Sequence, residues 1–233
     1  MWVKICGNTN AADAAMASEL GADAVGVIFA ASKRQVSIAQ AAAITSGLPA
    51  GVERIGVFDS QSADEIAEAA ERAGLTAVQI HREFDELAID VVRARLPEAV
   101  DITATLHWSV DEGDGAEHVA AALQRIAATG MVERVLIDSK VKGTSGGTGT
   151  AFDWSAARQV FREAPKELKL ILAGGLTPDT VAEAIAQLHA WGVDVSSGVE
   201  AAVGRKDRAR VAEFIRKAKS AEGRYRPSRA DDV

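Results

Sequence analysis

The sequence contains a single cysteine, Cys6, and few aromatic residues, which make up 5% of the chain. One cysteine excludes an internal disulfide framework and is typical of a reducing compartment. No apolar run approaches the roughly 20 residues that cross a bilayer. The net charge of -7 gives no electrostatic reason to expect nucleic-acid binding, which depends on clustered Lys and Arg. We therefore expect a cytoplasmic protein that binds neither nucleic acid nor membrane.

What the chain does contain is typical of a globular protein with a sizeable core: 48% of its 233 residues are hydrophobic and 25% are charged. Short β-branched runs alternate with longer Ala-rich stretches whose apolar residues recur at helical spacing. Strands are expected at Trp2–Cys6, Ala24–Phe29, Arg54–Phe58, Ala77–Ile80, Ile102–His107, Arg134–Ile137, Lys169–Ala173 and Val193–Val195. Helices are expected at Ala11–Glu19, Ile38–Ser46, Ala63–Ala73, Phe84–Arg95, Ala116–Thr129, Trp154–Glu163, Pro178–Ala190 and Asp207–Ala218.

This unbroken alternation predicts an α/β fold, a single-domain (β/α)8 TIM barrel with parallel strands and outer helices, over residues 1–220. A closed barrel is favoured over an open sheet because no GxGxxG follows the first strand. Thr177 before Pro178 predicts a helix N-cap, and four glycines lie where helices are expected to end, namely Gly21, Gly74, Gly130 and Gly192. Residues 221–233 lack an apolar period, so we expect a disordered tail.

The polar residues that follow the expected strands predict the functional site. In a barrel of this type the reactive groups lie at the carboxyl ends of the strands. The residues at these ends include Cys6, Arg34, Asp59, His81, His107 and Asp138. Such a ring suits a small anionic substrate, whereas no cluster has a spacing typical of metal ligands. We therefore predict no metal site.

Three glycine-rich stretches follow the last three expected strands, at 143–149, at Gly174-Gly175 and at Ser197-Gly198. Glycines let backbone N–H groups approach a phosphate, and a short extra helix often completes such sites in barrels. Val199–Ala202 is the expected extra helix. Ordinary turn glycines are the alternative for any one stretch.

Each remaining candidate has a structural alternative. A lone cysteine is more often a small buried hydrophobe, and Cys6 needs an electropositive setting such as Lys4 to act as a base. Asp138 can be a turn carboxylate, or an acid whose proton is retained by burial or a neighbouring charge. Arg34 can be a solvated surface residue, or can hold a carboxylate with its planar guanidinium.

The motifs at these positions closely resemble those of the phosphoribosylanthranilate isomerase family. They are Lys4–Gly7, Gly21–Gly26, Ser32–Ser37, Gly56–Phe58, Val78–His81, Leu136–Ser139, Gly146–Gly149, Ala173–Leu176 and Val193–Glu200. The resemblance runs from about residue 3 to 219 and outweighs the structural alternatives, because many ordered motifs are more specific than any one.

The resemblance implies an Amadori rearrangement of N-(5'-phosphoribosyl)anthranilate in tryptophan biosynthesis. Asp138 would be the acid that opens the ribose ring, and Cys6 the base that removes the C2' proton. Arg34 would hold the anthranilate carboxylate, His81 would line the substrate site, and the loops at Gly174-Gly175 and Ser197-Gly198 would hold the phosphate. A small phosphosugar is the expected partner of a monomer or homodimer.

Two positions depart from the family pattern. Arg82 stands where the family usually has glycine, and His107-Trp108 is an unexpected pairing. These changes put substrate breadth in doubt more than reaction class. The alternative enzyme is another phosphosugar isomerase or epimerase on the same barrel. Its substrate would have no aromatic carboxylate for Arg34 to bind. A non-catalytic binding protein is a third possibility that predicts loss of the acid or the base, and both are present.

Overall fold

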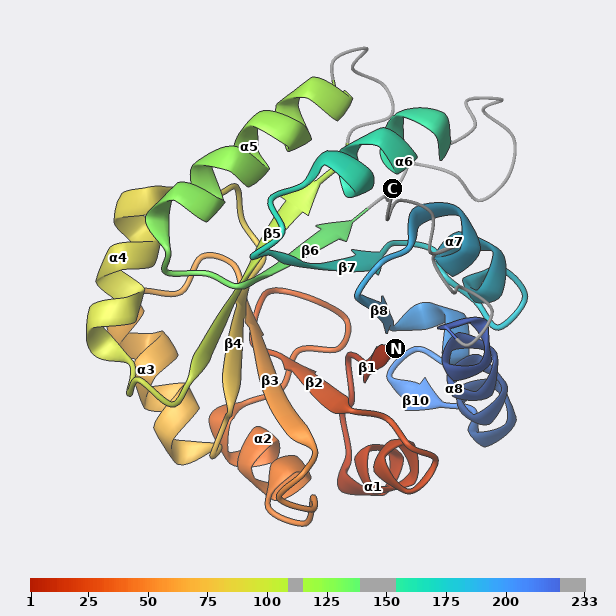
Figure 1. The fold of residues 1–233 in the computed structure, drawn as a ribbon. Coiled ribbons are helices and arrows are strands. Elements are labelled where there is room, and N and C mark those ends of the chain that lie inside the picture. Colours follow the sequence, from red (N-terminus) through yellow and green to blue (C-terminus); the bar gives the residue numbers. More distant parts are fainter. Residues whose placement is uncertain (109–114, 139–153, 223–233) are drawn as a thin grey trace.

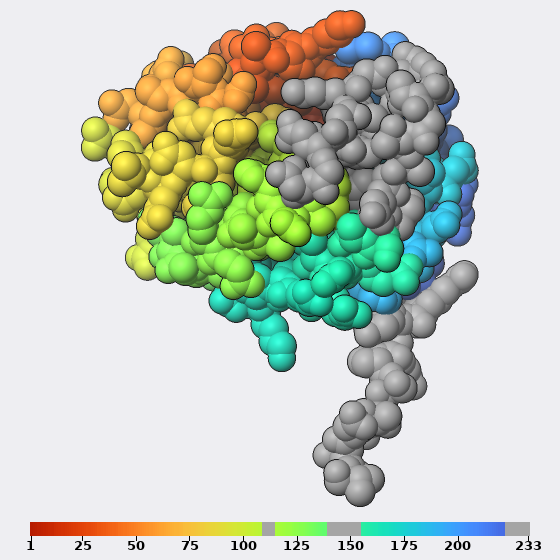
Figure 2. Space-filling model, turned by 90° about the horizontal axis from the view of Figure 1, so that it is seen from above, coloured from red at the N-terminus to blue at the C-terminus, as the bar shows by residue number. Residues whose placement is uncertain are grey.

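The computed structural model describes residues 1–108, 115–138 and 154–222. Eight parallel strands form a closed barrel in sequence order, with β1 pairing to both β2 and β8. The helices encircle these strands in chain order (Figure 1). In the space-filling view the colours pass round the molecule in the same order, from red through yellow and green to blue (Figure 2). The predicted (β/α)8 barrel is confirmed.

The strands of the barrel are β1 (Trp2–Ile5), β2 (Ala24–Ile28), β3 (Glu53–Phe58), β4 (Ala77–Ile80), β5 (Asp101–His107), β6 (Arg134–Asp138), β7 (Lys169–Ala173) and β8 (Gly192–Val195). The helices are α1 (Ala11–Glu19), α2 (Ile38–Thr45), α3 (Ala63–Arg72), α4 (Glu86–Arg95), α5 (Gly115–Thr129), α6 (Trp154–Glu163), α7 (Val181–Leu188) and α8 (Arg208–Glu222). After β8 come the 3-10 helix η1 (Ser197–Val199) and a two-stranded sheet of β9 (Glu200–Ala202) and β10 (Arg205–Lys206).

The start of α7 differs from the sequence prediction. The helix begins at Val181, and residues 177–180 form a turn closed by the Thr180 N–H on the Thr177 carbonyl at 3.2 Å. The Thr177 hydroxyl accepts the Asp179 N–H at 3.2 Å, and the Thr177 N–H donates to the Thr180 hydroxyl at 3.0 Å. Thr177 therefore caps this turn, and the predicted helix start at Pro178 was wrong because side-chain hydrogen bonds favour the turn.

Two expectations near β8 were also wrong. Gly192 does not end a helix: α7 ends at Leu188, its C-cap His189 is in the left-handed conformation, and Gly192 is the first residue of β8. Its lack of a side chain matters because a Cβ there would lie 2.8 Å from Trp2 Cε3. The extra helix lies at 197–199 as η1, whereas 200–202 pair with β10 as a strand. Gly21, Gly74 and Gly130 do have positive φ at helix ends, as predicted.

The core has two layers because successive side chains of each strand point to opposite faces. On β1, Val3 and Ile5 belong to the large cluster between strands and helices. Inside the barrel lie two small apolar clusters, Ala24, Ile55 and Ala77 in one and Leu136, Ile171 and Ala173 in the other. Polar side chains are buried as well, Lys4 and Gln79 among them. The strands therefore position polar groups within an apolar scaffold.

Within the described residues, no helix is both long and apolar enough to cross a membrane. The expected glycine loop at 143–149 lies outside the described residues, as do residues 223–233 of the expected tail. Residues 221 and 222 belong to α8, so this helix runs four residues beyond the predicted end at Ala218.

Candidate active site

A cavity of about 300 Å³ opens where the strands of the barrel end. The residues that line it follow strands from both halves of the chain, so the closed barrel brings them together. All eight residues that the sequence predicted for the site line this one cavity: Cys6, Arg34, His81, Asp138, Gly174, Gly175, Ser197 and Gly198. Asp59 and His107 are not among its lining residues.

Cys6 follows the last residue of β1, and 6% of its surface is exposed. Its backbone N–H donates to the Val195 carbonyl at 2.8 Å, which fixes it against the end of β8. Gly7 follows with a φ of 71°, a left-handed conformation that favours glycine. A Cβ on Gly7 would lie 2.7 Å from Arg34 Cδ, so this turn passes close beneath the arginine side chain.

Three polar side chains form a network next to Cys6 inside the barrel. The Lys4 ammonium donates to Gln79 Oε1 at 2.6 Å and to Asp194 Oδ2 at 3.3 Å. Burial raises the pKa of the Cys6 thiol, while the positive charge of Lys4 lowers it and the negative charge of Asp194 raises it. The net effect is a pKa above the usual value, so a thiolate at this position depends on nearby cations.

Arg34 comes from the β2–α2 loop and forms a bidentate pair with Glu200. Its Nε and Nη2 donate to the Glu200 oxygens at 2.7 and 2.6 Å. Lys206 also donates to Glu200 Oε1, at 3.1 Å. Burial raises the pKa of Glu200, but the bonds from Arg34 and the charge of Lys206 outweigh it and hold the pKa below the usual value. Arg34 keeps further N–H groups on Nη1, so the pairing orients the guanidinium without using all of its donors.

Asp138 is the last residue of β6, with 8% of its surface exposed. Its neighbours on the next two strands are imidazoles: the His81 and His107 rings meet edge to face with centroids 4.9 Å apart. Burial lowers the pKa of His81, and the charge on His107 lowers it further, so the His81 imidazole stays neutral near pH 7. Ligand atoms of these three residues lie within 4.8 Å of one another, a spacing that can hold a metal ion.

The two described glycine loops lie against each other. Gly174 and Gly175 have φ values of 93° and 66°, which favour glycine in this turn. A Cβ on Gly198 would lie 1.9 Å from the carbonyl oxygen of Leu176, so a side chain there would separate the loops. Residues of both loops line the cavity.

Sequence reasoning missed Gln79 and Asp194, which also line the cavity, and gave no role to Glu200. The available signal was a polar residue inside an apolar strand, as in Val78-Gln79-Ile80 and Val193-Asp194-Val195. A strand buried on both faces has no solvated side for such a residue, so it must find a partner inside the barrel.

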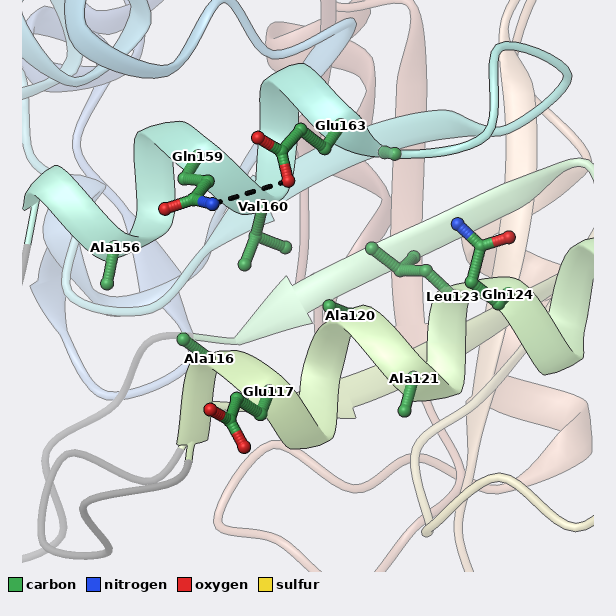
Figure 3. Close-up of a pocket in the computed structure, with 11 residues that line it drawn as sticks. Ala116, Glu117, Ala120, Ala121, Leu123, Gln124, Ala156, Gln159, Val160 and Glu163 are labelled. Atoms are coloured by element: carbon green, nitrogen blue, oxygen red, sulfur yellow. Dashed lines mark hydrogen bonds between the residues drawn. The ribbon is translucent and has the colours of Figure 1, made fainter.

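Two larger hollows lie elsewhere on the molecule. One, of about 500 Å³, is a groove between α5 and α6 lined largely by alanines, with Glu117, Gln124 and Gln159 around it (Figure 3). The other, of about 860 Å³, is lined by Trp2 and Trp191 at the opposite end of the barrel. Neither contains a paired acid and base near the strand ends, so the smaller cavity at the mouth is the candidate active site.

A closed (β/α)8 barrel with a thiol, a carboxyl group and an arginine around one cavity at the strand ends defines a barrel enzyme that acts on a small anionic substrate. The family described as N-(5'phosphoribosyl)anthranilate (PRA) isomerase matches residues 3–217. The chain therefore belongs to the N-(5'-phosphoribosyl)anthranilate isomerase family, as the sequence motifs predicted.

Individual relatives agree with this assignment. The N-(5'-phosphoribosyl)anthranilate isomerase of Pelobacter propionicus is 39% identical over 218 residues, which cover 93% of this chain and 95% of that one. The crystal structure of the Thermotoga maritima enzyme is 34% identical with a TM-score of 0.78, covering 94% and 99%. A phosphoribosyl anthranilate isomerase in complex with reduced 1-(o-carboxyphenylamino)-1-deoxyribulose 5-phosphate is 32% identical with a TM-score of 0.77, again covering 94% and 99%.

Proposed function

We propose that this chain converts N-(5'-phosphoribosyl)anthranilate into 1-(2-carboxyphenylamino)-1-deoxyribulose 5-phosphate, with Asp138 as the acid and Cys6 as the base. The observation that carries this proposal is that one cavity of a family member collects a thiol, a carboxyl group, an arginine and two glycine loops. The substrate has a matching set of parts: a sugar to be isomerised, a carboxylate and a phosphate.

Asp138 begins the reaction by giving a proton to the ring oxygen of the ribose. The C1'–O bond then breaks, its electron pair stays on the oxygen, and the nitrogen lone pair forms an iminium ion at C1'. The position of Asp138 at the end of β6, with its side chain at the cavity wall, supports this role.

Cys6 then removes the C2' proton. The iminium ion accepts the electron pair of the C2'–H bond, which gives an enolamine, and movement of a proton from the 2'-hydroxyl to C1' produces the ketose. The position of Cys6 at the end of β1, with its side chain at the cavity wall, supports this role. Each positioned proton transfer accounts for a rate factor on the order of 10²–10⁴.

The two anionic ends of the substrate bind at different loops. Arg34 holds the anthranilate carboxylate through the N–H groups that Glu200 does not use. The phosphate binds to backbone N–H groups of the loops at Gly174-Gly175 and Ser197-Gly198, which lie in contact. His81, which lines the same cavity, contacts the sugar.

The reaction is tested by incubating the protein with freshly made phosphoribosylanthranilate, following the loss of its fluorescence and identifying the product by mass spectrometry. We expect rapid loss in the presence of the chain and formation of the carboxyphenylamino ketose. The matched control is the same protein with Asp138→Asn. A folded wild-type protein that leaves the fluorescence unchanged contradicts the proposal.

The placement of the substrate ends is tested separately by a crystal structure grown with inorganic phosphate. We expect phosphate at the loops of Gly174 and Ser197. Phosphate bound against Lys33 and Arg34, with the glycine loops empty, would reverse the assignment of the two ends.

Three further predictions accompany this function. Residues 1–220 form the catalytic domain, the reaction takes place in the cytoplasm, and it needs no metal or organic cofactor. The choice between a monomer and a homodimer is decided by sedimentation of the purified chain.

A further inference from the structure

Lys4 is a charged side chain enclosed by the barrel, with 1% of its surface exposed. Its ammonium has one described carboxylate partner, Asp194 at 3.3 Å, and one neutral acceptor, Gln79 at 2.6 Å. Burial of an ammonium is costly unless it is well paired, and an apolar side chain at such a position is often as stable or more stable. A cation at this depth therefore suggests a task other than holding the fold together.

The backbone places Lys4 beside Cys6. Lys4 is on β1 and Cys6 follows that strand, two positions further along on the same inward-facing side. Val3 and Ile5 point the other way and pack against the helices. A Cβ on Gly26 of the neighbouring strand would lie 2.8 Å from Cys6 Sγ and 2.9 Å from Lys4 Cε. The sulfur and the end of the lysine side chain therefore meet over the same glycine.

Strand pairing and a hydrogen bond to β4 also fix the position of the Lys4 side chain. Lys4 and Asp194 are directly paired across β1 and β8, and Gln79 reaches Lys4 from β4. Burial lowers the pKa of Lys4, but attraction to Asp194 and Cys6 outweighs burial and raises the pKa above its usual value. Lys4 therefore remains an ammonium ion while the thiol changes its protonation state.

We propose that Lys4 is a positioning residue of this enzyme: its buried ammonium, held by Gln79 and Asp194, stabilises the Cys6 thiolate that removes the C2' proton. The inference rests on the proposed role of Cys6 as the base. Lys4 acts only through Cys6 and is not among the residues that line the cavity.

Other charged groups face Cys6 and must be considered in the test. Asp194 on β8 opposes the thiolate, Lys206 on β10 favours it less than Lys4 does, and Arg34 in the β2–α2 loop is attracted to it. Lys206 and Arg34 are both paired with Glu200, whereas Lys4 is paired with the residue that opposes the thiolate. Removal of Lys4 therefore takes away the strongest attraction and leaves the repulsion.

The chain has one cysteine, so a titration of its thiolate reports on Cys6 without interference. The first measurement is the ultraviolet thiolate absorbance against pH for the wild type and Lys4→Met, with Cys6→Ala as the blank. We expect the midpoint in Lys4→Met to rise by about one pH unit or more, because an adjacent opposite charge changes a pKa by this amount. The rising limb of kcat/KM against pH moves upward by the same amount.

The double variant Lys4→Met with Asp194→Asn removes both charges and separates a structural role from a role toward the thiolate. Its folding is checked by circular dichroism and thermal melting, and Lys4→Arg keeps the positive charge. We expect the double variant to titrate below Lys4→Met, because the repulsion from Asp194 is removed as well, and Lys4→Arg to recover part of the shift. A folded Lys4→Met with an unchanged thiolate midpoint overturns the inference, as does a double variant that titrates below the wild type or a kcat/KM lowered by one factor at every pH.

The proposed role of Cys6 as the base is refuted by a different result from the one that refutes the role of Lys4. Wild-type turnover by Cys6→Ala refutes the proposed base whatever the titration shows. An unchanged titration in the lysine variants, with an inactive Cys6→Ala, refutes only the role of Lys4.

Discussion

The Cys6 side and the Asp138 side of the cavity are built differently. The Cys6 side is packed among fixed charges, with Lys4 and Asp194 below it and Arg34 above it. The Asp138 side, where β5 and β6 end, has two imidazoles as neighbours, and one of them is exposed. The strand register places His107 directly beside Asp138.

The proposed roles of the two residues require different charges. A base has to lose its proton inside the barrel, so its anionic form needs a cation close by. An acid has to keep its proton until the ring oxygen is in place, so a neighbouring cation would work against it. Cys6 follows β1 and Asp138 ends β6, so the proposed base and the proposed acid belong to strands that are not neighbours in the barrel.

The largest effect is expected from removing either reactive group. Cys6→Ala and Asp138→Asn should each lower kcat by about 10²–10⁴ while the fold persists, because each removes one positioned proton transfer. Steady-state fluorescence assays give kcat, and circular dichroism checks the fold. Near-wild-type turnover in either variant would contradict the assignment of the two sides.

A smaller effect is expected from crowding the Cys6 side without changing its chemistry. Gly26→Ala would place a Cβ within 3 Å of the Cys6 sulfur and the Lys4 side chain. We expect kcat to fall by about tenfold to a hundredfold, since displacements of about 1 Å can have this effect, and stability to fall by about 1–3 kcal/mol. Turnover and urea unfolding measure the two changes.

The matched control is Gly51→Ala, because a Cβ at Gly51 has nothing within 4 Å. The stability of this variant against urea and its turnover should equal those of the wild type. Unchanged turnover in Gly26→Ala would mean that the packing around the thiol is unimportant.

The smallest effect is expected from removing His107, the exposed imidazole beside Asp138. His107 is exposed, and its described contacts are with His81, through the ring and a 3.2 Å contact to the backbone carbonyl. His107→Ala should lower kcat by less than about tenfold, because such ring pairs contribute about 0.5–1.5 kcal/mol. The metal chelator EDTA should leave wild-type turnover unchanged, although His81, His107 and Asp138 lie close enough to hold an ion. A loss as large as that of Asp138→Asn, or inactivation by EDTA, would show that this side depends on more than the carboxyl group.

The barrel could be predicted because its signals are local. Apolar runs, helical spacing and glycines such as Gly74 with positive φ indicate elements one at a time, and sequential strands in a parallel barrel then pair as neighbours. The start of α7 could not be predicted, because two threonine hydroxyls, of Thr177 and Thr180, favour a turn over the first helical turn.

The residues of the cavity were predictable from their places at strand ends, whereas their partners were not. Arg34 and Glu200 are 166 positions apart and Lys4 and Asp194 are 190 apart, so no local pattern indicates either pair. Only the closure of β1 against β8 brings the second pair into register.

The most direct test is a crystal structure of this chain with the reduced product 1-(2-carboxyphenylamino)-1-deoxyribulose 5-phosphate bound. We expect Cys6 Sγ against C2' and an Asp138 carboxyl oxygen within about 3 Å of the former ring oxygen, on opposite sides of the sugar. A ligand that contacts only one of the two residues, or that lies with both on the same side of its carbon chain, would contradict the account.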